Sequence, residues 1–156
     1  MTIAFFCLMS CSVPLNLSEN KEAKLTGSWT TTTVTIPEFK DGFEIKQEGD
    51  DLMFYYYNNA EKSIGYAGRI VNNPDLSEKS GYIIIQITNS GTWYKTMDYY
   101  YTLHWKDFTG DNVKQSSAYN GGKPENNNGM ATEHAARKEY TVDNGYFASH
   151  GIYARD

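Results

Sequence analysis

Apolar and polar residues alternate along several short segments of the chain, with the period of two that is typical of a half-buried β-strand. In residues 43–48 the alternate positions are Glu and Lys, and Gly49 then begins a turn. Residues 52–57 follow as the return strand of a predicted hairpin. The same reasoning predicts further strands, separated by turns rich in Gly, Asn and Asp, over residues 64–72, 82–88, 99–105, 113–119 and 146–155.

One helix is predicted, over residues 130–139, because this stretch is rich in Ala and Glu and lacks further Gly and Pro. Its apolar face is thin, with three alanines and Tyr140, so we expect it to rest on a sheet. The segment before it, residues 121–129, is rich in Asn and Gly and is predicted to be a polar, mobile loop.

The number and spacing of the strands indicate the fold class. About eight strands joined by short links predict an all-β domain with one short helix, built as an antiparallel up-and-down meander. Eight strands can close into a barrel, which removes the exposed edges that invite aggregation. We therefore expect a closed barrel over residues 26–156, with an open sandwich as the alternative.

Both ends of this domain carry a short motif. Gly27-Ser28-Trp29 opens the first strand and Arg155 closes the last one. The pair resembles the lipocalin and wider calycin pattern, which implies that Trp29 plugs one end of a barrel and Arg155 lies across its ring. Such a cation–π contact contributes about 0.5–2 kcal/mol. The alternative is that Trp29 is an ordinary core residue and Arg155 a solvated charge.

The resemblance extends to the C-terminal half of the chain. Residues 101–106 and 144–147 are similar to segments of small lipocalin-like bacterial lipoproteins of unassigned function. The helix before the last strand also matches the lipocalin order. The Thr30–Thr33 run departs from the family pattern, and its second and third motifs are absent.

The N-terminal residues have the features of an exported leader. An apolar run over residues 3–9 is followed by Ser10 and Cys11, and Leu8–Cys11 resembles the bacterial lipobox, which implies acylation of Cys11. Residues 1–11 are then a signal peptide, residues 12–25 a flexible tether, and the protein is anchored by lipid in the bacterial cell envelope, at the outer membrane or cell surface. The alternative is an ordinary signal peptide cut near Ser10 or Ser12, in which Cys11 has no role. The leader lacks a positive start, which predicts a start codon further upstream.

Composition and charge exclude several classes of partner. The chain has 156 residues, a net charge of -5 and a pI near 5.2, so it has no basic surplus with which to bind nucleic acid. No apolar run approaches the roughly 20 residues of a membrane-spanning helix. Both cysteines lie in the first eleven residues, which excludes a disulfide framework, a cysteine nucleophile and a cysteine metal site in the domain.

The sequence offers little catalytic chemistry. His104, His134 and His150 stand on separate predicted elements, and zinc sites need three or four converging ligands. We expect His104 to be solvated on an outward face. Motifs of hydrolases, phosphate-binding loops and zinc proteases are absent. We therefore expect no enzymatic activity, no cofactor and no metal.

The excess of aromatic residues is the remaining feature of the sequence that bears on function. Tyr99, Tyr101 and Trp105 alternate along one strand, and we expect them to face the barrel interior as candidate ligand-binding residues. Aromatic side chains in a barrel can fill it completely, line a pocket for a small apolar ligand, or form a recognition patch. The first functional hypothesis is a ligand-binding barrel. The second is an interaction or adhesion module with a solid barrel, which binds a protein partner through loops such as residues 121–129.

Overall fold

The fold is taken from a computed structural model that describes residues 23–33 and 40–156. The predicted leader, its Cys11 and most of the predicted tether lie outside the described residues. The elements follow one another as β1 (Gly27–Thr31), β2 (Gly42–Glu48), β3 (Asp51–Tyr57), β4 (Ile64–Ile70), β5 (Gly81–Asn89), the 3-10 helix η2 (Gly91–Trp93), β6 (Tyr100–Lys106), β7 (Asn112–Ser117), the 3-10 helix η3 (Pro124–Asn126), α1 (Glu133–Glu139) and β8 (Gly151–Arg155).

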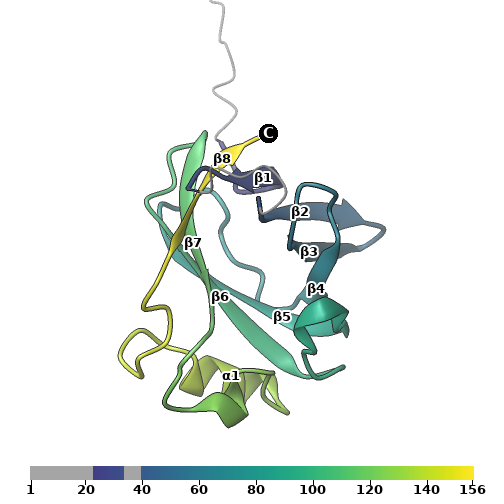
Figure 1. The fold of residues 1–156 in the computed structure, drawn as a ribbon, viewed down its shortest axis with the longest axis vertical. Coiled ribbons are helices and arrows are strands. Elements are labelled where there is room, and N and C mark those ends of the chain that lie inside the picture. Colours follow the sequence, from purple (N-terminus) through teal and green to yellow (C-terminus); the bar gives the residue numbers. More distant parts are fainter. Residues whose placement is uncertain (1–22, 34–39) are drawn as a thin grey trace, which may run out of the picture.

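The eight strands form a closed antiparallel barrel in which each strand pairs with its neighbours in sequence. β1 pairs with β8 in the register Trp29↔Arg155, and this pairing closes the sheet. The predicted fold class and the predicted closure are therefore confirmed. Figure 1 shows β1 and the C-terminus at one end of the barrel and α1 at the opposite end.

The strand alternation places aromatic side chains in the barrel interior. Trp29, Phe43, Phe54 and Tyr66 are all buried, and their rings stack in sequence with centroid separations of 5.8, 5.8 and 6.0 Å. Aromatic pairs of this kind contribute about 0.5–1.5 kcal/mol each beyond their burial. The barrel end near β1 is therefore filled by side chains.

Trp29 and Arg155 meet at this filled end, as the sequence predicts. The guanidinium carbon lies 4.3 Å from the ring centroid of Trp29, whose side chain is buried. The glycine at position 27 leaves space for this contact. Its φ is 114°, and an added Cβ would lie 2.9 Å from Arg155 Nη1. A side chain at residue 27 would therefore displace the arginine.

Arg155 also donates hydrogen bonds to three backbone carbonyls. Its Nε donates to Gly110 (2.8 Å), its Nη1 to Thr26 (2.8 Å) and its Nη2 to Lys24 (2.6 Å). These carbonyls belong to the β6–β7 turn and to the segment that enters β1. One side chain thus joins the last strand to the first strand and to a turn between them.

Three predicted elements differ from the structure at their N-terminal ends. β6 begins at Tyr100, because Asp98 has a left-handed φ of 63°, and this leaves Tyr99 38% exposed. The prediction that Tyr99 faces the interior is therefore wrong. β8 begins at Gly151, since Phe147 has a φ of 61° that interrupts the predicted strand. α1 begins later than predicted, where Thr132 accepts a hydrogen bond from Ala135 as its N-cap.

The predicted contact between helix and sheet is present, because α1 packs against β5 and β6. Ala136 and Tyr140 supply its buried face, whereas Ala131 is exposed. Within the described residues no helix is long and apolar enough to cross a bilayer.

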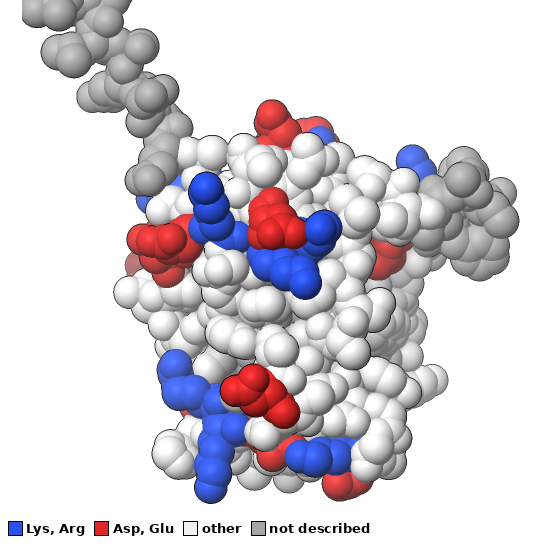
Figure 2. Space-filling view, turned by 90° about the vertical axis from the view of Figure 1, so that its left-hand side faces the viewer, with Lys and Arg blue, Asp and Glu red and all other residues white. Residues whose placement is uncertain are grey.

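Charges of both signs are mixed on the surface. On the face shown in Figure 2, Lys and Arg lie beside Asp and Glu, and neither sign covers the face continuously. Pairs such as Lys114–Asp107 (2.8 Å) and Lys46–Glu48 (3.1 Å) are solvent-exposed. Exposed pairs contribute about 0–1 kcal/mol each, so the core and the Arg155 contacts dominate stability.

Replacing Arg155 by Met should lower the free energy of unfolding by about 2 kcal/mol, because the cation–π contact and three donated hydrogen bonds are lost. Urea denaturation measures the change. Arg137→Met is the matched control, since Arg137 makes only an exposed ion pair with Glu133 (2.7 Å), and it should cost less than about 0.5 kcal/mol. Equal losses in the two variants would contradict this role of Arg155.

Candidate ligand pocket at the α1 end of the barrel

A pocket of about 840 Å³ lies at the end of the barrel opposite to Trp29. Its size falls within the range of about 300–1,000 Å³ that is usual for small-molecule sites. Its walls come from β3, β6, β7, β8 and the loops near α1. The lining residues are Tyr56, Thr92, Trp93, Tyr94, Lys95, Tyr101, Gln115, Ser116, Ser117, Tyr119, Asn127, Asn128, Ala148, Ser149, Gly151 and Tyr153.

Lys95 is the one charged residue of this lining, and its side chain is buried among aromatic rings. Lys95 is 6% exposed, and its Nζ lies 3.9 Å from the ring centroid of Tyr101. The rings of Tyr66 and Trp93 lie further away, at 5.7 and 5.8 Å. Nζ also donates a hydrogen bond of 2.5 Å to the carbonyl of Asn127.

The backbone between β5 and β6 turns Lys95 into the pocket. Gly91 lets η2 lie close against β4, because its φ is 53° and an added Cβ would approach Gly65 O to 2.2 Å. Tyr94 then takes a left-handed φ of 51°, which reverses the chain directly before Lys95. Thr96 N donates to Asn128 O (2.9 Å) and holds the reversed segment in place.

The surroundings of Lys95 disfavour its charge. Burial lowers the pKa of the ammonium group from 10.5 to about 8. Among residues 23–33 and 40–156, no Asp or Glu lines the pocket and no ion pair includes Lys95. The group therefore stays mostly protonated at neutral pH and depends on ring faces and one carbonyl for its stabilisation.

The hydroxyls of the three buried tyrosines of the pocket are engaged by the protein itself. Tyr56 and Tyr153 both donate to one carboxylate oxygen of Asp41, at 2.5 and 2.8 Å. Tyr101 donates to the carbonyl of Ala118. Burial is the main cause that raises the pKa of all three phenols, so they stay neutral. The tyrosines therefore present ring faces to the pocket, which makes its walls largely apolar.

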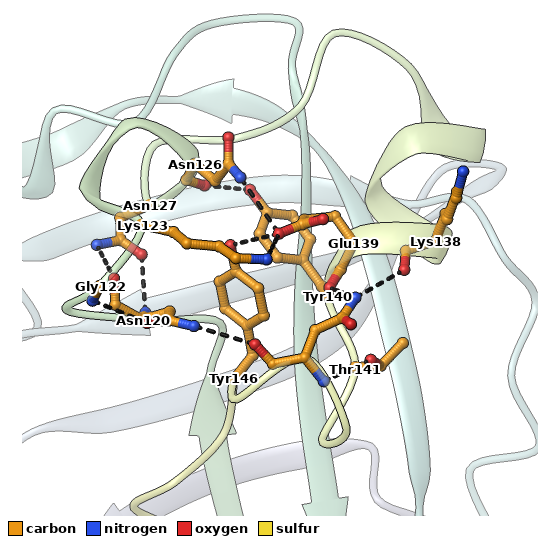
Figure 3. A network of polar contacts seen from close by, with 11 residues as sticks. Asn120, Gly122, Lys123, Asn126, Asn127, Lys138, Glu139, Tyr140, Thr141 and Tyr146 are labelled. Carbon is orange, nitrogen blue, oxygen red and sulfur yellow. Dashed lines mark hydrogen bonds and ion pairs between the residues drawn. The ribbon is translucent and has the colours of Figure 1, made fainter.

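The Asn-rich loop beside the pocket is held by hydrogen bonds, as Figure 3 shows. Glu139 Oε1, at the end of α1, accepts from Lys123 (2.7 Å), Asn126 (3.3 Å) and Tyr146 (3.1 Å). Lys123 therefore holds the pKa of this carboxyl below its usual value. The loop predicted to be mobile is instead joined to the helix by charge-assisted bonds.

Within the same loop, Asn120 and Asn127 bind each other. Asn120 N donates to the side-chain oxygen of Asn127 (2.9 Å), and Asn127 Nδ2 donates to Asn120 O (3.1 Å). The pair fixes the Asn127 carbonyl, which accepts from Lys95. The hydrogen bonds within this loop, and those that join it to Glu139 of α1, thus help to hold the buried Lys95 in position.

Of the residues predicted to bind ligand, only Tyr101 lines the pocket. Trp105 is buried deeper in the core, where its Nε1 donates to Glu78 O (3.1 Å), and Tyr99 lies outside the barrel interior. Sequence reasoning missed Lys95, which lies in a polar segment without strand or helix periodicity. Its burial follows from the backbone reversal at Tyr94 and from contacts with residues distant in sequence, such as Tyr101 and Asn127.

Two histidines that were predicted to stand alone are brought together. His104 Nδ1 and His150 Nε2 lie 2.8 Å apart, and the His104 ring packs on Tyr82 at 4.6 Å. His104 is therefore half-buried and not solvated as predicted, while His134 is exposed on α1. Neither histidine of the pair lines the pocket, and the described residues contain no group of three or more potential metal ligands.

The fold and the pocket together define the class of protein, an antiparallel barrel filled at one end and hollow at the other. Comparison with known proteins adds no relative, because no family model, no curated protein and no solved structure matches this chain. Membership of the lipocalin family stays a prediction from Gly27, Trp29 and Arg155.

The histidine pair predicts a loss of stability in acid. Burial and the nearby Lys106 lower the pKa of His150 from 6.5 to about 4. Lys114 also lowers the pKa of His150, whereas Asp107 raises it. Burial and Lys106 lower the pKa of His104 as well. Between pH 6.5 and pH 4 the unfolded chain therefore binds protons that the folded chain does not, so stability falls as the pH falls.

Replacing His150 by Gln should make the acid-induced decrease in the free energy of unfolding smaller by about 1 kcal/mol. The expected effect is this small because solvent screens the partly exposed ring. Urea denaturation at pH 7 and pH 4.5 measures the difference between the two pH values. His134→Gln, on the exposed face of α1, should leave the difference unchanged. The same pH dependence in wild type and His150→Gln would show that the pair does not contribute.

Proposed function

We propose that this chain is a lipid-anchored, lipocalin-like protein of the bacterial cell envelope that holds a small apolar ligand in the pocket at the α1 end of its barrel. The observation that carries the proposal is the pocket itself, about 840 Å³ in volume with aromatic walls. Because the hydroxyls of Tyr56, Tyr101 and Tyr153 are bonded within the protein, an apolar ligand would meet the ring faces of these three residues without depriving their hydroxyls of a partner.

The rim of the pocket supports the same proposal. Tyr94 is 83% exposed and Tyr119 is 65% exposed, and Trp93 beside them is also exposed. Apolar surface gathered at the mouth of a cavity is typical of a binding site. Burial of such surface by a ligand contributes about 25 cal/mol per Å². A barrel with this pocket fits ligand binding better than the solid barrel of the interaction-module hypothesis.

The point at which the N-terminal segment enters the barrel is consistent with a lipid-anchored protein that binds a ligand. Lys24 O, close to the start of the described residues, accepts from Arg155 at the filled end of the barrel. A tether attached there would leave the opposite, hollow end directed away from a membrane (Figure 1). The lipobox-like residues Leu8–Cys11 support the anchoring part of the proposal, which is independent of the pocket.

Ligand binding is tested by obstructing the pocket. Ser149→Trp adds a large side chain to the lining and should weaken binding of a fluorescent apolar probe such as N-phenyl-1-naphthylamine at least ten-fold. Glu61→Trp, in the exposed β3–β4 turn, is the control and should bind as the wild type does. Fluorescence titration measures both. Equal affinities in the two variants, or no binding by the wild type, would contradict the proposal.

Lipid anchoring is tested at Cys11. Metabolic labelling with a clickable fatty acid should mark the wild type and not Cys11→Ala, because the acylated thiol is removed. Cys7→Ala is the matched control and should keep the label. Labelling of the Cys11→Ala protein at the wild-type level would contradict anchoring and would leave the pocket unaffected.

A further inference from the structure

Lys95 is a buried cation in the wall of the pocket. Its ammonium group has three hydrogens, and among the described residues it makes one hydrogen bond, to Asn127 O. The ring of Tyr101 stabilises the charge but accepts only weakly, and no carboxylate of the described residues lines the pocket. A buried charge is normally paired, so the lining has one positive charge in excess.

We infer that the ligand is an amphiphile with a single anionic head group, a carboxylate in the simplest case, which Lys95 binds while the apolar tail lies against the aromatic walls. This inference rests on the proposed function and specifies the chemistry of its ligand. A carboxylate supplies the negative charge that the described lining lacks, and its oxygens accept hydrogen bonds from the ammonium group.

Other ligand classes fit the lining less well. A cationic ligand would meet the ammonium group of Lys95, which already occupies the face of Tyr101. A hydrocarbon or a simple ester would leave the ammonium group without a counter-charge and would add desolvation to it. An anionic amphiphile gives the ammonium group a counter-charge and places its tail against the aromatic walls.

The test compares two probes that differ only in the head group, dodecanoate and dodecanol, both kept below their aggregation concentrations. Displacement of N-phenyl-1-naphthylamine from the full domain at pH 7 measures the two affinities. Wild-type protein should bind dodecanoate at least ten-fold more tightly than dodecanol.

Lys95→Met should weaken dodecanoate binding at least ten-fold and change dodecanol binding less than two-fold. Lys138→Met, on the exposed face of α1, is the matched control and should have no effect. Circular dichroism confirms the fold of each variant, and we expect Lys95→Met to fold because it removes a buried charge. A ten-fold loss for both probes would indicate a general effect on the pocket and would overturn the role of Lys95.

A pH series on the wild type gives a readout that needs no variant. Dodecanoate affinity should fall between pH 7.5 and pH 10 as Lys95, whose pKa is about 8 before the anion binds, loses its proton. Burial keeps the pKa of the facing phenols of Tyr66 and Tyr101 above this range. Dodecanol affinity should stay constant over the same range. Parallel profiles for the two probes would contradict the ionic contact.

The outcomes separate the two proposals. Equal affinities of the wild type for dodecanoate and dodecanol overturn the anionic head group and leave the apolar ligand proposal standing. Binding of neither probe, and of no naphthylamine, overturns both.

Discussion

Closure of the sheet between β1 and β8 is the constraint on which the remaining structure depends. The two strands are far apart in sequence, and Arg155 joins them by lying over Trp29 while it donates to three carbonyls around the barrel end. These bonds hold the first and last strands in one register. A closed sheet has no exposed edge, and its interior is bounded by side chains on all sides.

The closed barrel then divides its interior unevenly. Near β1 the stacked rings of Trp29, Phe43 and Phe54 occupy the interior, whereas the α1 end keeps a pocket of about 840 Å³. The two ends therefore serve different purposes. The filled end supplies apolar burial for folding, so the hollow end can keep a buried charged lysine that reduces stability. Polar groups kept at such a cost are typical of functional sites.

The sequence predicted more of the fold than of the site. Strand alternation and turn residues identified the barrel, because burial of one strand face imposes a period of two that local sequence records. Tyr101 was predicted correctly as an interior residue, and Tyr99 was not, since the left-handed Asp98 ends the alternation before Tyr100. Lys95 was missed altogether. Its burial depends on a backbone reversal and on a loop near residue 127, and neither leaves a periodic signal.

By itself the sequence determined the class of fold and the absence of cysteine chemistry from the domain. These follow from residue type, spacing and count, which need no knowledge of distant contacts. The contact between Trp29 and Arg155 was implied by the resemblance to the lipocalin pattern, and the structure shows it. Only the tertiary structure decided that the barrel is hollow at one end, that His104 meets His150, and that Lys95 lies among aromatic rings with no carboxylate in the described lining of the pocket. Each of these depends on residues distant in sequence, whose approach is set by the closure of the sheet and the packing of the loops against it.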